Sequence, residues 1–402
     1  MGLREDLDTI LAEKGVGALL LYAESFKDVN MYYLTGFLAP DPFILLKKLD
    51  GAPIIVIGQM EFPRAQKESI VKDVRPYADY DYLRIVKTAE EPKLGVMKFL
   101  ASVVKKELDE GTIIGVPSSF PALAADTLRQ EGLTIKPTFN LIEKARETKE
   151  PEEIKEISRV QKVVEEVTAE IIDLIANCQV GPGGKLIHES EGRREPLTVG
   201  KVKTILGHKF LDHWCALEED IIVAAGPPSA DPHYSGEPQD QLRADQPIVL
   251  DIYPRSIRRR YWADITRTVV KGRAPDEVKR MFEAVLEAKN ACLDALHEGV
   301  LGSEMFNLCC DLLERAGYPT IRRGKQIAKG FIHGLGHGVG LEIHEDPRMS
   351  EVYKFPLKEH SIVTVEPGLY DPKIGGVRIE DIVEITKKGC NNLTKMETPL
   401  EI

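Results

Sequence analysis

Two hairpin-like segments in the second half of the chain constrain the fold most, because each carries acidic residues within both of its apolar arms. In the first segment, the arms QPIVLDIYP (246–254) and YWADITRTVV (261–270) flank the basic turn RSIRRR. In the second, SIVTVEPGLY (361–370) and VRIEDIVEIT (377–386) flank DPKIGG. Apolar runs of this length around a short polar turn predict antiparallel hairpins. The acids within them must therefore occupy defined faces of a sheet.

If each hairpin is symmetric about its turn, Asp251 lies opposite Asp264 and Glu366 lies opposite Glu380. Opposed residues share a face of the sheet, with Cβ atoms roughly 5 Å apart. The neighbouring strand residues are apolar, so paired carboxylates would repel each other at a substantial cost unless a cation compensates. The cation is either a metal ion or one of the nearby arginines, which are Arg255, Arg258, Arg259, Arg260, Arg267 and Arg378.

The glycine-rich run FIHGLGHGVGLEIHE (331–345) supplies three histidines between the two hairpins: His333, His337 and His344. His333 and His337 are four residues apart, but the four glycines around them disfavour a helix. Glycines instead suit a backbone that packs closely against a site and presents imidazoles at fixed points. This run favours a metal ion over the alternative of an arginine ion pair.

Four carboxylates and one imidazole form an oxygen-dominated ligand set that can bridge two divalent ions. Such a set suits Mn²⁺ or Co²⁺, with Fe²⁺ or Zn²⁺ as alternatives, and disfavours a cysteine-type structural zinc site. Two ions a few ångströms apart share a water, lower its pKa and polarise a substrate carbonyl. The pattern therefore indicates metal-assisted amide hydrolysis.

The pattern of apolar and polar residues along the whole chain predicts two domains that differ in secondary structure. Residues 1–150 alternate apolar runs with helical patterns, which is typical of an α/β domain. The expected strands are 17–23, 43–58 (a hairpin that turns at Asp50-Gly51) and 112–116, and the expected helices are 92–110 and 120–132. We find no catalytic residue types at meaningful spacing in this domain, and we expect it to have a structural or dimerisation role.

The second domain, residues 151–402, begins at a charged stretch in which Pro151 occupies a favoured first helical position. A long helix is expected there, followed by a loop over 181–196 and then by more helix. The order of helices, hairpin, helices, hairpin recurs at a spacing of 115 residues, from Asp251 to Glu366. This repetition predicts a domain of two similar halves.

Composition narrows the classes of function. The 402 residues include 53 Lys+Arg and 64 Asp+Glu, for a net charge of −11, and this excess of acid argues against a nucleic-acid partner. No apolar run approaches the ~20 residues that span a bilayer, and the first residues are not signal-like, so we expect a cytoplasmic protein without a membrane partner. The six scattered cysteines form no CxxC pair, and we expect reduced, mostly buried thiols.

In these motifs the chain resembles the pita-bread-fold metallopeptidases, which include methionine aminopeptidase, aminopeptidase P and prolidase. The resemblance covers about 155–402 and rests on SADPHY, LDIYP, ADITRT, HGLGHGVGLEIHE, TVEPGLY and GGVRIED, in that order. Residues 1–150 are similar in pattern to the smaller domain of the prolidase and aminopeptidase P branch. The resemblance implies an α+β fold, in which an N-terminal α/β creatinase-type domain precedes a pita-bread (creatinase/aminopeptidase) catalytic domain, and it implies a homodimer.

The resemblance also implies roles for the candidate metal ligands. Asp251 would chelate one metal ion, and Asp264 and Glu380 would bridge the two ions of each chain. His337 and Glu366 would complete the shell of the other ion. Glu366 would also act as the general base that takes a proton from the bridging water.

Substrate contacts follow from the same resemblance. His233 and His344 match positions that contact the substrate and steady the tetrahedral intermediate. His333 and Arg378 match positions that line the pocket of the Pro-specific members, with Arg378 a candidate for the substrate's C-terminal carboxylate, and Tyr370 is a further lining residue. The bond before proline has no N–H, so its cleavage needs a dedicated pocket. The implied activity is hydrolysis of Xaa-Pro bonds in dipeptides or short peptides, of the prolidase or aminopeptidase P type.

Two alternatives share this fold. A creatinase-like C–N hydrolase lacks the metal acids, and non-catalytic binding modules have lost the ligands, so the retained ligand set argues against both. One departure from the family pattern is the spacing of 13 residues between Asp251 and Asp264, two more than in many prolidases. An even insertion at a hairpin tip leaves both acids on one face, so we expect the site to survive. The four arginines of the turn 255–260 contact the substrate, a neighbouring subunit or only solvent, and we expect them in solvent or in ion pairs.

Overall fold

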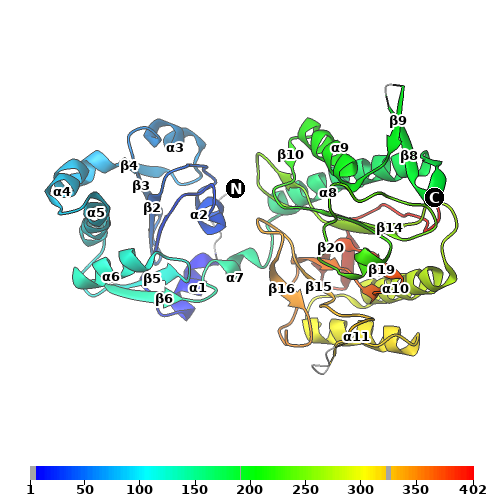
Figure 1. Cartoon of the computed structure of the whole chain (residues 1–402). Helices are drawn as coiled ribbons and strands as arrows, with labels where there is room; N and C mark the ends of the chain where they lie inside the picture. The colour runs from blue at the N-terminus through cyan, green and yellow to red at the C-terminus, as the bar shows by residue number, and fades with distance from the viewer. Residues whose placement is uncertain (1–5, 191, 323–326) are drawn as a thin grey trace. The chain divides into compact units, whose positions relative to one another are not determined.

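The computed structural model describes residues 6–190, 192–322 and 327–402. The chain divides into two compact units, residues 1–146 and 147–402, whose helices and strands are labelled in Figure 1. Each unit has hydrophobic clusters of its own, as expected of separate domains.

The N-terminal unit is a mixed sheet with helices on both faces (Figure 1). Its elements are α1 (Leu7–Glu13), β1 (Ala18–Ala23), α2 (Val29–Thr35), β2 (Phe43–Lys48), β3 (Pro53–Ile57), α3 (Phe62–Glu68), β4 (Asp73–Pro76), α4 (Tyr82–Thr88), α5 (Pro92–Glu107), β5 (Ile113–Pro117), α6 (Ala122–Gln130), β6 (Thr134–Thr138) and α7 (Glu143–Arg146). The strand order is β4-β3-β2-β1-β5-β6. Leu19 and Leu21 of β1 pack into one cluster and Ala18 and Leu20 into the other, so both faces of the sheet are covered. The predicted α/β domain is confirmed.

The C-terminal unit consists of two similar halves, each with long helices that precede an antiparallel sheet. The first half contains α8 (Pro151–Ala176), β7 (Gln179–Val180), β8 (Leu186–Ser190), β9 (Arg193–Pro196), α9 (Val199–Asp212), β10 (Cys215–Ala216), β11 (Ile222–Ala225), β12 (Ile248–Ile252), β13 (Arg255–Ser256) and β14 (Ile265–Val269). The second contains α10 (Asp276–Ala295), α11 (Gly302–Arg315), β15 (Gly336–Gly338), β16 (Glu345–Met349), β17 (Ile362–Val365), β18 (Gly368–Asp371), β19 (Gly375–Arg378), β20 (Asp381–Thr386) and β21 (Gly389–Asn392). The main sheets are ordered β11-β12-β14 and β16-β15-β17-β20-β21. The predicted repetition is confirmed.

Helix α8 packs against the sheet β11-β12-β14. It begins at Pro151, as predicted, and a capping box between Glu150 and Glu153 satisfies its first turn. Val160, Val164 and Val167 recur at helical spacing and are buried in the cluster that also contains β12 and β14. One face of α8 therefore lies against the strands that carry the first pair of acids.

The prediction of a loop over 181–196 is wrong. Strands β8 and β9 form an antiparallel hairpin within the three-stranded sheet β7-β8-β9. Most of β9 is exposed, so this strand lacks the alternation of apolar and polar residues by which a half-buried strand is recognised.

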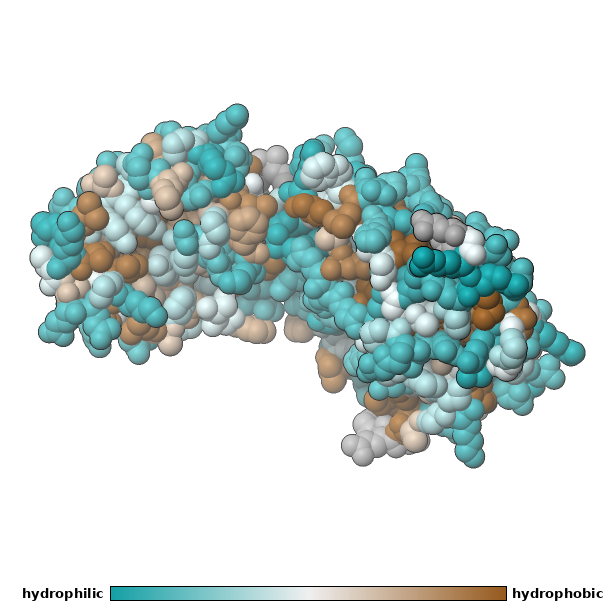
Figure 2. All heavy atoms as spheres, turned by 45° about the horizontal axis from the view of Figure 1, so that its top comes forward, coloured by the Kyte–Doolittle hydropathy of each residue, from teal (hydrophilic) through white to brown (hydrophobic). Residues whose placement is uncertain are grey.

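The surface and the thiols agree with the composition. Hydrophilic residues cover most of the face drawn in Figure 2, and apolar residues reach it in small groups. All six cysteines have free thiols, and all but Cys390 are buried, as predicted. Among the helices within the described ranges, none combines the length and the apolar character needed to cross a membrane.

Candidate active site

The predicted site residues gather around one cavity of about 380 Å³ in the C-terminal unit. The cavity is lined by Glu219, Ile222, Pro232, His233, Asp251, Tyr253, Asp264, His333, Gly334, Gly336, His337, Ile343, His344, Arg348, Ser350, Glu366, Arg378 and Glu380. The lining includes all the predicted site residues except Tyr370. Tyr370 lies behind the wall, where its hydroxyl is 2.7 Å from Nη1 of Arg378 and 2.9 Å from Nε2 of His333. Both halves of the unit contribute, so the cavity depends on their packing.

A compact group of potential metal ligands lies in this cavity. Ligand atoms of Asp264, His337 and Glu380 all lie within 4.8 Å of one another, and all three residues are buried. Nε2 of His337 is 3.3 Å from Oε1 of Glu366. Oδ1 of Asp264 is buried and has no hydrogen-bond partner among the described residues. An unpartnered buried carboxylate oxygen is costly, and a bound cation would satisfy it.

The pKa shifts of the acids also favour a bound cation. Burial raises the pKa of Asp264 well above its usual range, and the neighbouring charge of Glu380 raises it further. Burial, together with Glu366 and Asp251, raises the pKa of Glu380 in the same manner. Carboxylates must lose their protons to bind a metal. A divalent ion would thus replace the protons that burial and mutual repulsion otherwise favour on these acids, and the residues present fit such an ion.

His337 offers its Nε2 lone pair to the cluster. Its Nδ1 is 3.2 Å from the carbonyl oxygen of Gly338. Because a carbonyl can only accept, Nδ1 carries the proton and Nε2 is left as the acceptor facing the carboxylates. Burial lowers the pKa of His337 to about 3, and His344 lowers it further. The imidazole is therefore neutral at neutral pH, as a metal ligand must be.

The first hairpin differs from its predicted register. Asp251 pairs with Thr266, so Asp264 lies two residues away from the position opposite Asp251. The prediction of a direct Asp251–Asp264 pair is wrong because the chain reverses over 257–260, one residue later than a symmetric turn would, with Arg260 in the left-handed region (φ 64°). A shift of two residues preserves the face, and both acids line the cavity.

The second hairpin has the predicted register. Val365 pairs with Asp381, and Gly368 pairs with Arg378. Both pairs imply that Glu366 and Glu380, which lie between them, are opposite each other. Oγ1 of Thr364 donates a hydrogen bond of 3.3 Å to Oε1 of Glu366. Burial raises the pKa of Glu366 to about 7, although Arg378 lowers it and Asp251 raises it again.

The glycine run is not helical: its centre, Gly336–Gly338, forms β15, and it packs closely, as predicted. A Cβ atom on Gly336 would lie 2.1 Å from the carbonyl oxygen of Thr364, and one on Gly338 would lie 2.4 Å from that of Asp346. No side chain fits at these distances, so glycine is required where β15 lies between β16 and β17. The close approach brings His337 to the carboxylates.

Arg378 is engaged by protein acceptors through all its nitrogen atoms. Nη2 forms an ion pair of 2.5 Å with Oδ2 of Asp251. Nε donates to Oγ1 of Thr266 (3.2 Å), and Nη1 donates to the hydroxyl of Tyr370. Tyr370 can in turn donate to Nε2 of His333, because Nδ1 of His333 faces the carbonyl of Gly334 at 2.7 Å and so carries the proton. The guanidinium group therefore holds Asp251 and one wall of the cavity.

Several cavity residues were missed from the sequence. Arg348 lines the cavity from β16, and Glu219 and Tyr253 line it from the first half. Arg348 lies in the short strand β16, in which Asp346 and Arg348 are half-buried while alternate residues are buried, but the segment EDPRM has no apolar alternation that indicates a strand. The two remaining predicted histidines differ in environment. His344 lies against His337, with ring centres 4.4 Å apart, whereas His233 is exposed.

Two arginines of the turn 255–260 contact protein groups outside the cavity lining. Arg255 is buried and forms an ion pair with Glu218. The guanidinium of Arg258 lies 4.5 Å from the centre of the Trp214 ring. For Arg255, the expected ion pair is confirmed.

Comparisons with known proteins agree on family and architecture. Residues 155–387 match the family model described as Metallopeptidase family M24, and residues 4–148 match that of the Creatinase/Prolidase N-terminal domain. An Xaa-Pro dipeptidase of Pyrococcus furiosus is 32% identical over 379 residues, which cover 93% of each chain. Among solved structures, the Xaa-Pro dipeptidase from Bacillus anthracis aligns with a TM-score of 0.80 and 24% identity over 99% of this chain and 98% of that one. The prolidase from Pyrococcus furiosus aligns with a TM-score of 0.72 and 26% identity over 97% and 100%.

Proposed function

Because this chain belongs to metallopeptidase family M24, we propose that it is a metal-dependent Xaa-Pro dipeptidase. The resemblance to the pita-bread-fold metallopeptidases is confirmed by the family match, and relatives aligned over most of the chain are named Xaa-Pro dipeptidases. The observation that carries the proposal is the buried group of Asp264, His337 and Glu380, with Asp251 and Glu366 in the same cavity. A creatinase-like hydrolase or a binding module would not need these acids together.

The five predicted ligands would hold two divalent ions, with Mn²⁺ or Co²⁺ as the proposed metals. Four deprotonated carboxylates carry four negative charges, which two such ions neutralise. When bound, the ions supply Lewis acidity that activates a water and polarises the scissile carbonyl. The protein's part is to orient and enclose the ligands.

Glu366 is the proposed general base. Burial raises the pKa of Glu366 to about 7 before a metal ion binds, so its surroundings favour proton uptake, as a general base requires. The Thr364 hydroxyl orients Oε1, so Glu366 can hold the proton there and return it to the leaving nitrogen. His233 and His344, on the same cavity, are proposed to donate hydrogen bonds to the substrate.

Arg348 is the better candidate for the substrate's carboxylate. Arg378 uses its Nε, Nη1 and Nη2 atoms on protein acceptors, so binding a carboxylate would require it to release Asp251 or Tyr370. Arg348 lines the cavity, and its charge lowers the pKa of His344 after burial has done so. We assign Arg378 instead to holding Asp251. His333 and, behind it, Tyr370 are proposed to form the wall that accepts the proline ring.

The test is to strip metal with a chelator, restore Mn²⁺ or Co²⁺, and compare three substrates: an Xaa-Pro dipeptide, an Xaa-Pro-Yaa tripeptide and a dipeptide without proline. We expect metal-dependent cleavage of the Xaa-Pro dipeptide and little cleavage of the other two. Preference for the tripeptide would identify an aminopeptidase P. Absence of metal-dependent cleavage of all three would overturn the proposal.

A further inference from the structure

Gln161 is a fully buried amide in the apolar face of α8. Its exposed fraction is 0%, and its neighbours in the helix include the buried Val160 and Val164. A glutamine in such a position must find partners for its two N–H donors and its oxygen, because an unsatisfied buried amide is costly. Its partners lie next to strands: Asp264 directly precedes β14, and Thr394 follows β21.

The side-chain amide of Gln161 forms two hydrogen bonds with the main chain of Asp264. Its Oε1 accepts from the Asp264 N–H at 3.2 Å, and its Nε2 donates to the Asp264 carbonyl at 3.0 Å. Nε2 also donates to Oγ1 of Thr394 at 2.9 Å. Because an N–H can only donate and a carbonyl can only accept, these partners settle which end of the amide is oxygen. Each polar atom of the Gln161 side chain is therefore used.

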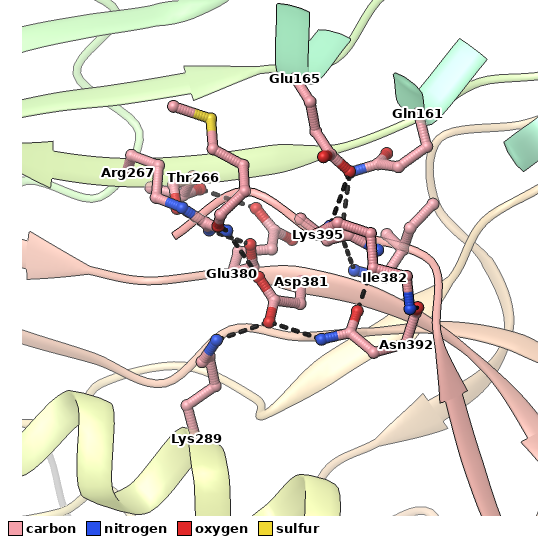
Figure 3. Close-up of polar contacts among 12 residues, drawn as sticks. Gln161, Glu165, Thr266, Arg267, Lys289, Glu380, Asp381, Ile382, Asn392 and Lys395 are labelled. Atoms are coloured by element: carbon pink, nitrogen blue, oxygen red, sulfur yellow. Dashed lines mark hydrogen bonds and ion pairs between the residues drawn. The ribbon is translucent and has the colours of Figure 1, made fainter. Parts of the chain in front are cut away.

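Thr394 connects Gln161 to β20, the strand that directly follows Glu380. Oγ1 of Thr394 accepts from the N–H of Ile382 at 3.0 Å, and Ile382 is two residues beyond Glu380. Figure 3 shows Gln161 descending from α8 toward this junction, with Glu380 and Asp381 on the strand below it. The amide thus joins a strand of the first half to a strand of the second.

The register explains why a side chain is needed at this point. Thr266 and Glu380 pair antiparallel, and the N–H of Glu380 donates directly to the carbonyl of Thr266 at 3.1 Å. Two residues further, the same register would bring Asp264 opposite Ile382. In place of a direct bond there, the side chains of Gln161 and Thr394 link the two main chains. The two main chains are therefore hydrogen-bonded directly at Thr266 and Glu380. Two residues further along, they are linked through the side chains of Gln161 and Thr394.

A second set of contacts, which does not involve Gln161, holds Glu380 in place. Nη1 of Arg267 donates to the carbonyl of Glu380 at 2.6 Å, and Nη2 forms an ion pair of 2.8 Å with Asp381. Lys289 and Asn392 bind the other oxygen of Asp381 at 2.5 and 3.0 Å (Figure 3). With Glu380 anchored in this way, the contacts of Gln161 decide where Asp264 lies relative to it.

We propose that Gln161 is a positioning residue that sets the separation between the carboxylates of Asp264 and Glu380. The inference rests on the proposed function, in which these two carboxylates bridge two metal ions. Neither the length nor the polarity of this side chain is dispensable, because it must reach Asp264 and Thr394 at once. Its loss would loosen the bridging pair without removing a ligand.

The test compares Gln161→Met with Thr168→Val in the whole chain. Methionine matches the length of glutamine without its polar atoms. Thr168 is a matched control, because it is buried in the same helix and its hydroxyl has no hydrogen-bond partner among the described residues. Metal-free proteins are titrated with Co²⁺, and binding is followed by calorimetry and by the visible absorption of bound Co²⁺, with circular dichroism as the check of folding.

We expect wild type and Thr168→Val to bind two Co²⁺ ions alike. Gln161→Met should remain folded, bind Co²⁺ roughly 10- to 100-fold more weakly, and show an altered Co²⁺ spectrum. If Gln161→Met does not fold, Gln161→Glu and Thr394→Val carry the test, since each removes only part of the linkage and should weaken Co²⁺ binding less.

The two possible failures are distinguishable. Wild-type protein that binds no Co²⁺ would overturn the proposed function itself. Wild-type protein that binds two ions, together with folded Gln161 and Thr394 variants of unchanged affinity and spectrum, would overturn the role of Gln161 alone.

Discussion

Glu366 combines burial, an orienting hydroxyl and a pKa near neutrality in one carboxyl group. We expect Glu366→Gln to lower kcat for an Xaa-Pro dipeptide by roughly 10²- to 10⁴-fold, because an amide cannot take up the proton. The variant should keep its fold and part of its Co²⁺ binding. Steady-state kinetics with restored metal measure the effect, and an unchanged kcat would refute the assignment of Glu366 as base.

The two cavity arginines should differ in what they change. Arg348→Met should raise KM for the dipeptide roughly 10- to 100-fold, the value of a charged hydrogen bond, while Co²⁺ affinity stays the same. Arg378→Met should weaken Co²⁺ binding, because it leaves Asp251 and Tyr370 without their partner. Kinetics and Co²⁺ titration of both variants separate the roles. The reverse pattern would return the carboxylate-binding role to Arg378.

His333 makes stability depend on pH with a definite sign. Burial and then the charge of Arg378 lower its pKa to about 3 in the folded protein, against 6.5 for an ordinary histidine. Below pH 6.5 the unfolded chain takes up a proton that the folded protein does not, so this contribution to stability is full above pH 6.5 and is lost as the pH falls towards 3. Its slope is at most about 1.4 kcal/mol per pH unit.

His333→Asn should therefore show a shallower loss of unfolding free energy between pH 6 and pH 4 than the wild type. Urea unfolding at a series of pH values, with both proteins free of metal, measures the difference. Parallel curves would show that His333 does not remain neutral in the folded protein.

At the scale of elements, strand β16 is tied to the start of α8 by a buried ion pair. Nζ of Lys149 lies 2.7 Å from Oε1 of Glu345, with side-chain exposures of 2% and 7%. Oε2 of Glu345 also accepts from the N–H of Glu342 at 3.3 Å, which holds the turn that presents His344. The pair thus connects a helix start to the cavity wall.

Lys149→Met should lower the free energy of unfolding by about 3–5 kcal/mol, because it removes one partner of a buried ion pair. Lys162→Met is the control: Lys162 is on α8, its side chain is 78% exposed, and its pair with Glu166 spans 3.7 Å. That variant should change stability by about 1 kcal/mol or less. Equal effects in chemical denaturation would contradict the importance of the buried pair.

Elements also show where sequence reasoning succeeds. The long helix, the glycine run and the acid-bearing hairpins were predictable because each has a local periodicity or a local steric demand. The hairpin at 186–196 was not, because an exposed strand has no apolar alternation. The register of the first hairpin was off by two residues because the turn is centred one residue later than a symmetric turn, with Arg260 in the left-handed region, and no local pattern marks that centre.

At the scale of the whole molecule, the homodimer implied by the family resemblance stays a prediction. Light scattering coupled to size-exclusion chromatography should give a mass of about 90 kDa, twice the 44.8 kDa of one chain. A mass near that of a single chain, at concentrations at which the enzyme is active, would contradict it.

The sequence by itself determined the two-domain order, the two similar halves, the acids that line the cavity and the family. It could do so because side chains alternate along a strand, and because an even shift in register leaves the faces unchanged. Only the tertiary structure decided which distant groups meet: Asp264 with His337 and Arg378 with Asp251 across the two halves, and Gln161 with both Asp264 and Thr394. Those contacts join residues about 70 to 230 positions apart, so they depend on how the halves pack and leave no local pattern in the chain.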